Sequence, residues 1–192
     1  MPVDYLTEEQ EQRYGRYVGE PTPEQLARYF HLDDEDRLLI AQRRGDYNRL
    51  GFGIQIGTLR FLGTFLADPV NVPVGVIAYV ASQLRIANPQ CIVRYAERIQ
   101  TQQDHAQEIR QHYSYKEFAD RRGGFALMRF LYARIWIGTE RPSVLFDLAT
   151  AWLLDKKVLL PGVTTLTRLI STIRERVAER LWQRVSAAVS HY

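Results

Sequence analysis

Apolar residues recur at helical spacing along most of the chain, and no segment alternates apolar and polar residues as a half-buried strand does. This pattern predicts about ten helices and an all-α fold. The expected helices span residues 7–15, 22–30, 33–43, 50–66, 74–84, 89–96, 100–112, 125–137, 144–153 and 164–185. The β-branched run at 74–84 is assigned to a helix because of its length and because no second strand is available to pair with it.

Three of the expected helix starts carry recognisable capping residues. Thr7 is expected to cap the first helix, with Gln10 three residues on. Thr22 is expected to cap the second helix, with Pro23 at the first helical position and an acidic residue that suits the positive end of the helix. Asp33 or Asp34 is expected to cap the next helix. Capping and solvation explain the acidic run through Asp36 better than a metal site does, because no metal-loop pattern accompanies it.

The segment 50–66 is the most apolar of the first half and contains the glycine pattern G-x-G-x-x-x-G from Gly51 to Gly57. Glycines weaken a helix but permit a neighbouring backbone to approach closely. The spacing differs from that of a dinucleotide-binding fingerprint, and no strand precedes it. We therefore expect these glycines to serve helix packing.

Charge and glycine interrupt the helical pattern at Arg121-Arg122-Gly123-Gly124. This break predicts two helical modules, residues 1–120 and residues 121–192. In the second module Trp152 shares an apolar face with Leu145, so we expect its ring to lie in the core.

Residues 142–185 have the form of a helix-turn-helix. An apolar-faced helix is followed by two lysines, a short apolar hook, a Pro-Gly pair and a second periodic segment. Thr164 and Thr165 could cap that second helix, whose positive end attracts phosphate. In such a module Thr165 and Arg168 would lie where base edges are read. An ordinary helical hairpin capped by threonine is the alternative interpretation.

The positive charge is concentrated at the C-terminal end. The chain carries +3 overall, but residues 1–47 carry −5 and residues 121–192 carry +7. Of the 25 basic residues 22 are arginine, whose side chain pairs bidentately with phosphate and with guanine. Arg176, Arg180 and Arg184 lie one turn apart beside the apolar ridge of the last helix, either as a solvated face or as phosphate contacts. Composition therefore points to nucleic acid as a partner.

A complete active site is not expected. The four histidines lie in unrelated polar settings, and P-loop, HExxH, CxxC and GxSxG patterns are absent. The single cysteine excludes an internal disulfide. No apolar run reaches the roughly 20 residues of a membrane span, and the N-terminal residues lack the features of a signal peptide, so we expect a cytoplasmic protein without a membrane partner.

Four segments together resemble a known family. They are YLTEEQEQRYGRY, EPTPEQLARYFHLDDEDRLLIAQRRGDYNRLGFGIQIGTLRFLGTFL, YAERIQTQQDHAQEIRQHYSYKEF and RPSVLFDLATAWLLDKKVLLPGVTTLTRLI. In this order they are similar to the N-terminal region of Tn3-family transposases, the domain catalogued as DUF4158. One departure lies at 111–115, where relatives tend to carry a glycine before the tyrosine.

The resemblance implies a helical region that binds the terminal inverted repeats of a transposon. It also implies a longer chain whose Mg²⁺-dependent catalytic carboxylates lie outside these residues, so that this fragment is not itself an enzyme and needs no cofactor. The implied partners are double-stranded DNA at the transposon ends, the remainder of the transposase chain and a second subunit in a homodimer. The implied location is the bacterial cytoplasm, with nucleoid association when DNA is bound.

Candidate DNA-binding residues follow from the positions at which the family pattern falls in both modules. They are Arg43, Arg44, Asn48, Arg49, Arg60, Lys156, Lys157, Thr164, Thr165 and Arg168. Arg176 is added because it flanks the candidate reading helix. Arg60, isolated on an apolar helix, is either a phosphate contact or a buried ion-pair partner.

Two other functions are compatible with these features. The chain could be a protein-interaction module that holds transposase subunits together, or a stand-alone helix-turn-helix regulator. Salt dependence separates DNA binding from protein assembly, because phosphate contacts weaken by orders of magnitude between low and moderate salt.

Overall fold

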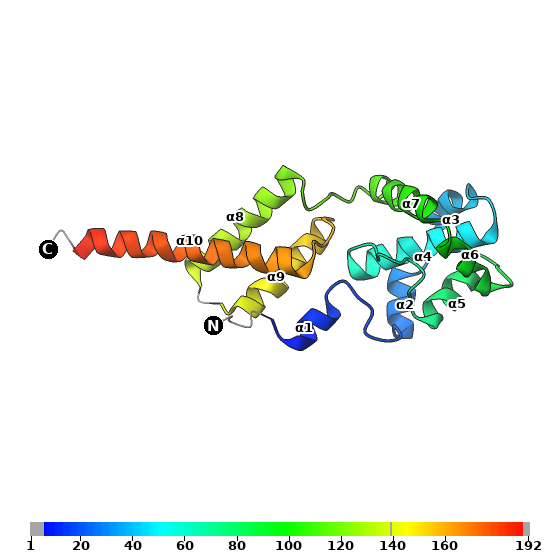
Figure 1. Ribbon diagram of the computed structural model, residues 1–192, viewed down its shortest axis with the longest axis horizontal. Helices are drawn as coiled ribbons and strands as arrows, with labels where there is room; N and C mark the ends of the chain where they lie inside the picture. Colours follow the sequence, from blue (N-terminus) through cyan, green and yellow to red (C-terminus); the bar gives the residue numbers. More distant parts are fainter. Residues whose placement is uncertain (1–5, 139, 190–192) are drawn as a thin grey trace. The chain divides into compact units, whose positions relative to one another are not determined.

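The computed structural model describes residues 6–138 and 140–189, and every regular element in these ranges is a helix (Figure 1). Within the described ranges, Lys116 and Val158 form an isolated bridge but no strand. The predicted all-α class is therefore confirmed.

The helices follow the predicted order along the chain. They are α1 (Glu8–Arg13), α2 (Pro23–Tyr29), α3 (Asp34–Ala41), α4 (Asp46–Leu62), α5 (Val74–Gln83), α6 (Val93–Ala96), α7 (Ile99–His112), α8 (Arg121–Ile137), α9 (Pro142–Asp155) and α10 (Val163–Val189), with the 3-10 helix η1 (Pro89–Ile92) before α6.

The helices form two compact units. One unit is Gln12–Tyr115, and the other contains the described parts of residues 1–11 and 116–192. We call them the α4 unit and the α10 unit after their most central helices, and each is described by itself.

In the α4 unit the glycine-rich helix α4 is the central element. It contacts α2, α3, α5, α6, α7 and η1, and every one of its residues from Leu50 to Leu59 is buried. The glycines allow close contact, as predicted, but the groups that approach are side chains rather than backbones. A Cβ atom on Gly51 would lie 2.3 Å from the ring of Tyr95, and one on Gly57 would lie 2.2 Å from the ring of Phe30.

Replacing Gly57 with alanine should therefore destabilise the α4 unit, although alanine is the better helix former. Phe30 is fully buried and cannot move without displacing the core, so overpacking should cost about 1–3 kcal/mol. Urea unfolding followed by circular dichroism measures this. Gly124→Ala in α8 is the control, because its nearest neighbour would lie at an ordinary 3.6 Å. That variant should be neutral or more stable by up to about 1 kcal/mol. Equal effects of the two substitutions would contradict the packing argument.

The predicted caps at Thr7, Thr22 and Asp33 are all present, and in each case the residue three positions on completes a capping box. The Thr22 hydroxyl accepts a hydrogen bond from the Gln25 backbone N–H, and the Gln25 side chain accepts one from the Thr22 N–H. Asp33, rather than Asp34, caps α3 in the same reciprocal manner with Asp36. These pairs fix where α2 and α3 begin.

Two helix starts differ from the prediction. α4 begins at Asp46 rather than Leu50, because its first turn is polar and lies outside the apolar pattern. α8 begins at Arg121 and runs through both glycines, although the pair Gly123-Gly124 was interpreted as a break. Two glycines cost a helix only about 1 kcal/mol each, and burial of Leu127 and Leu131 on the same helix outweighs this cost.

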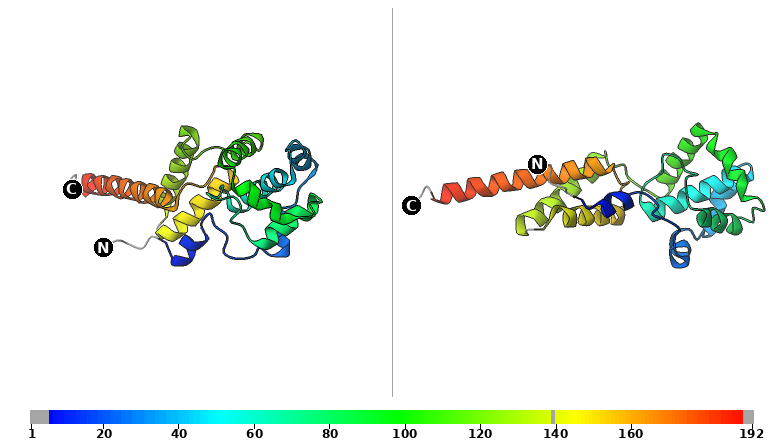
Figure 2. Two further views of the ribbon diagram at one scale, coloured as in Figure 1. Left: turned by 45° about the vertical axis from the view of Figure 1, so that its right-hand side comes forward. Right: turned by 60° about the horizontal axis from the view of Figure 1, so that its bottom comes forward.

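In the α10 unit three helices, α8, α9 and α10, pack against one another. Their buried residues recur every three or four positions. They are Leu127 and Leu131 on α8, Leu145, Phe146, Ala149 and Leu153 on α9, and Leu166, Ile170, Ile173 and Val177 on α10. α10 crosses α8 and continues past it (Figure 2). Leu181, Trp182 and Val185, near the C-terminal end of α10, are exposed.

The prediction that Trp152 lies in the core is wrong. The buried stripe of α9 passes through Leu145, Ala149 and Leu153, and Trp152 lies at its edge. Its indole is half-buried and stacks on Phe130 of α8, with 6.1 Å between the ring centres.

Candidate nucleic-acid interface

Arg60 is held by a buried carboxylate in the α4 unit. Its Nη1 and Nη2 atoms donate to the two carboxylate oxygens of Asp36 at 2.8 and 2.7 Å. Asp36 is fully buried, so the earlier attribution of this acid to solvation is wrong. The guanidinium also donates to the His31 carbonyl and lies over the ring of Tyr113. Of the two roles considered for Arg60, the structure thus places it in an ion pair.

Arg43 is engaged in a similar way. Its Nη1 and Nη2 atoms donate to the Glu108 carboxylate at 2.8 and 2.5 Å, and the guanidinium lies 4.6 Å from the centre of the Phe52 ring. A bidentate pair of this kind uses the two N–H groups that would otherwise grip a phosphate. Arg43 therefore joins α7 to the end of α3 and has little capacity left for a ligand.

The remaining candidates of this unit lie at the start of α4. Arg49 donates to Asp46 at 3.2 Å and to the Leu84 carbonyl at 3.4 Å, and the Asn48 amide donates to the Arg44 carbonyl at 2.9 Å. The side chain of Arg44 is exposed. The structure thus brings these residues to one turn, and among them Arg44 is the most accessible cation.

The segment between α9 and α10 is more than a short turn. Lys156 and Lys157 are exposed, and Lys156 pairs with Asp155 at 2.8 Å. Val158 is buried, and its neighbours exchange two backbone hydrogen bonds with Lys116: the Lys116 N–H donates to the Lys157 carbonyl and the Leu159 N–H to the Lys116 carbonyl. Both lysines therefore sit on a segment fixed by backbone pairing.

The first turns of α10 present the predicted reading residues to solvent. Thr164, Thr165 and Arg168 are all exposed. The helix begins at Val163, and the Gly162 carbonyl accepts hydrogen bonds from the N–H groups of Thr165 and Leu166. The prediction that Thr164 or Thr165 caps this helix is wrong. An N-cap residue precedes the first helical residue, which here is Val163, whereas both threonines lie inside the first turn.

Arg176 lies farther along α10, facing a groove against α8. The groove has a volume of about 680 Å³, and a second groove of about 420 Å³ adjoins it, since both are lined by Tyr132 and Arg180. The two grooves bring together four arginines, namely Arg129, Arg176, Arg180 and Arg184. The row of arginines on α10 (Arg176, Arg180 and Arg184) was predicted from the sequence, but its aromatic neighbours on α8 were not. The signal that could have found them is the helical spacing of Tyr132 and Trp136 after Arg129.

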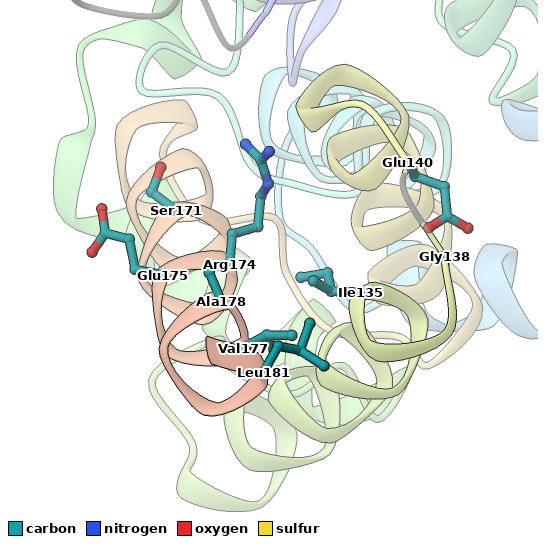
Figure 3. Close-up of a pocket in the computed structure, with 9 residues that line it drawn as sticks. All are labelled: Ile135, Gly138, Glu140, Ser171, Arg174, Glu175, Val177, Ala178 and Leu181. Atoms are coloured by element: carbon teal, nitrogen blue, oxygen red, sulfur yellow. The ribbon is translucent and has the colours of Figure 1, made fainter. Parts of the chain in front are cut away.

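A different groove lies against the end of α8 (Figure 3). It has a volume of about 520 Å³, and Val177 and Leu181 of α10 face Ile135 across it. Its charges are mixed, because Arg174 is accompanied by Glu140 and Glu175. It therefore lacks the excess of positive charge that an anionic polymer requires.

The described residues contain no group of three or more His, Cys, Asp or Glu side chains that could hold a metal ion. Among the same residues, no helix is both long and apolar enough to cross a membrane.

Comparison with known proteins places these features in a family. The sequence profile described as "Domain of unknown function (DUF4158)" matches residues 5–173. The transposase for transposon gamma-delta of Escherichia coli (strain K12) is 55% identical over 187 residues, which cover 97% of this chain and 19% of that protein. The transposase for transposon Tn501 of Pseudomonas aeruginosa is 35% identical over 160 residues, or 82% of this chain and 16% of that protein.

The transposase for transposon Tn1546 of Enterococcus faecium is more distant, at 28% identity over 86% of this chain and 16% of that protein. The chain thus spans less than a fifth of the length of these relatives. From the match over most of its length, the chain belongs to the DUF4158 family, and its relatives are Tn3-family transposases, as the sequence predicted.

Proposed function

We propose that this chain is a DNA-binding part of a transposase and that it recognises the terminal inverted repeats of a transposon as double-stranded DNA. The observation that carries the proposal is the exposure of Thr164, Thr165 and Arg168 on the first turns of α10, within a C-terminal segment of charge +7. The names of the relatives make transposon DNA the natural ligand.

In this proposal the start of α10 enters the major groove. Arg168 reads a base edge, because arginine pairs bidentately with guanine there. Lys156 and Lys157 contact phosphates from the segment that precedes α10, and Arg44 is the candidate contact from the α4 unit. Arg43 and Arg60 act in folding, since carboxylates already occupy their guanidinium groups.

The catalytic chemistry of such a transposase belongs to other residues. We propose that the two-metal site for Mg²⁺ lies in the remainder of the longer chain and that this part acts as a non-catalytic module. A homodimer of the whole protein is part of the same proposal, because two transposon ends must be held at once. Nucleoid association is also part of it, because the protein would be bound to DNA.

The test of this function is the substitution Arg168→Ala. It should cost roughly 1–3 kcal/mol of binding free energy on a transposon end and little on scrambled DNA, because only a base contact distinguishes the two. Lys156→Ala and Lys157→Ala serve as controls: each should weaken binding to both DNAs alike and reduce the salt slope by about one unit. Titrations at several salt concentrations measure both quantities. An unchanged ratio of specific to scrambled binding in Arg168→Ala would remove the start of α10 as the reading element.

A second candidate function is assembly with another protein segment, because apolar side chains are exposed near the C-terminal end of α10. Trp182 is 73% exposed, and Leu181 and Val185 accompany it. Analytical ultracentrifugation separates the two functions. An assembly module should show a mass that rises with concentration and little affinity for DNA.

A further inference from the structure

Two arginines of α10 are stacked on aromatic rings of α8. The Cζ atom of Arg180 lies 5.6 Å from the centre of the Tyr132 ring, and its Nη1 atom donates to the Tyr132 hydroxyl at 3.0 Å. The Cζ atom of Arg184 lies 5.0 Å from the centre of the Trp136 ring. The two rings stack on each other, with 5.9 Å between their centres and 15° between their planes. The four side chains therefore form one continuous cluster, which we call the arginine–aromatic cluster.

The cluster faces solvent and carries an excess of positive charge. Arg180 and Arg184 are exposed, while the rings beneath them are half-buried. The adjoining grooves add Arg129 and Arg176, and of their lining residues Glu179 alone is acidic. This surface differs from the groove in Figure 3, where one arginine is accompanied by two glutamates.

An arginine stacked on an aromatic ring can still bind a phosphate, whereas an arginine paired with a carboxylate has its donors occupied. A guanidinium on an aromatic face keeps most of its in-plane N–H donors free, and a side chain that is already ordered loses less entropy when it binds. Arg43 and Arg60 are the internal contrast, because a carboxylate occupies their donors. Arg180 and Arg184 are therefore ordered but still able to donate.

Distance along α10 indicates which part of DNA the cluster would meet. Arg180 follows Arg168 by twelve residues, which corresponds to roughly 18 Å along the helix axis. The major groove is only about 12 Å wide. At roughly 100° per residue, Arg180 and Arg184 also point about 120° and 160° around the helix axis from Arg168, so with Arg168 at a base edge the cluster would meet phosphates outside the groove that Arg168 enters.

We propose that the arginine–aromatic cluster is a phosphate-binding site for the backbone of double-stranded DNA, on a face of α10 other than the one that meets the bases. This inference rests on the proposed function and adds a second contact surface to it, with Tyr132 and Trp136 as positioning residues for Arg180 and Arg184. Binding at this surface is independent of base sequence.

The test compares variants that remove charge with variants that remove only the aromatic support. Arg180→Gln and Arg184→Gln should each reduce the salt slope of DNA binding by about one unit and weaken binding to transposon ends and scrambled DNA equally. Trp136→Leu should weaken binding to both DNAs with the net charge unchanged, because Arg184 loses its support. Trp136→Phe, which keeps a ring, should restore most of the affinity. Circular dichroism establishes that each variant is folded.

Arg134→Gln is the matched control. It removes a positive charge from α8, the helix that carries Tyr132 and Trp136, but Arg134 is already paired with Glu140 at 3.0 Å. It should change the salt slope much less. If the wild-type chain binds DNA but Arg180→Gln and Arg184→Gln bind with the same affinity and slope, the cluster is not a phosphate site, while the proposed function stands. If the wild-type chain binds no DNA, both fail. Competition by polyglutamate as strong as that by DNA would identify a general site for acidic polymers and overturn the proposal.

Discussion

Replacing Asp36 with alanine should lower the free energy of unfolding of the α4 unit by about 3–5 kcal/mol, as expected when one partner of a buried ion pair is removed. The substitution leaves the Arg60 guanidinium without its carboxylate. It also removes the acceptor for the hydroxyl of Tyr113 and for the Asp33 backbone N–H. A loss of this size is a large part of the roughly 5–15 kcal/mol that stabilises a typical domain.

The electrostatics of Asp36 add a pH dependence to this prediction. Burial alone would raise the pKa of the carboxyl, but hydrogen bonds from Arg60 and Tyr113 and the charge of Arg60 outweigh burial and hold the pKa below its usual value. A lowered pKa in the folded state means that the ionised carboxylate stabilises the fold above the unfolded pKa of about 4. This contribution is lost as the pH falls through the lower pKa of the folded state.

Glu35→Ala is the control for Asp36→Ala. Glu35 is the preceding residue of α3, and its Oε1 atom lies 2.9 Å from Nε2 of His112, but its side chain is exposed. An exposed pair contributes about 0–1 kcal/mol, so this variant should unfold almost as the wild type does. Asp36→Asn, which keeps the shape and loses the charge, covers the case in which Asp36→Ala does not fold. Urea unfolding followed by circular dichroism at pH 7 measures all three. A cost for Asp36→Ala as small as that for Glu35→Ala would show that the buried pair contributes little.

The helix starts at Thr22 and Asp33 could be predicted because their signals are local. A capping box needs residues only three positions apart, and the sequence shows both members. The start of α8 could not be predicted, because Gly123-Gly124 has the local composition of a break. The helix continues through these glycines because Leu127 and Leu131 are buried against other helices. Such long-range contacts cannot be read from the local composition.

The candidate site was predictable only in part, for the same reason. The arginines could be identified by type, but their partners are distant in the sequence. Glu108 lies 65 residues from Arg43, and Asp36 lies 24 residues from Arg60. The exposure of Arg168 was predictable, because its place in the first turns of α10 follows from helical periodicity alone. Periodicity shows which arginines can face solvent, but not which of the others a carboxylate occupies.

A second large effect is expected at His105, which is buried and neutral. The amide nitrogen of Gln55 donates to the Tyr95 hydroxyl at 2.7 Å and to the Gln102 carbonyl at 3.2 Å. Because a carbonyl only accepts, this fixes the orientation of the Gln55 amide, and the Tyr95 hydroxyl is left to donate to Nδ1 of His105 at 2.9 Å. The proton of the neutral imidazole therefore lies on Nε2. Burial, aided by the charge of Arg43 and opposed by Glu108 and Asp104, lowers the pKa of His105 to about 4.

Acidification from pH 6.5 to pH 4 should therefore destabilise the α4 unit by about 3 kcal/mol through His105 alone. In this window the unfolded chain, whose histidine has a pKa of about 6.5, binds a proton that the folded chain does not bind, so stability falls as the pH falls. Above about pH 7.5, where the histidine of the unfolded chain is also neutral, the residue adds no pH dependence. The unfolding free energy of His105→Gln, measured at steps of half a pH unit, should depend less steeply on pH than that of the wild type. Within the window the slope should be smaller by the equivalent of about one bound proton. Ile109→Val on the same helix is the control, since Ile109 is fully buried and its truncation should cost about 0.5–1.5 kcal/mol at every pH. An unchanged slope in His105→Gln would mean that His105 is protonated in the folded chain and that the Tyr95 hydroxyl accepts from it rather than donates.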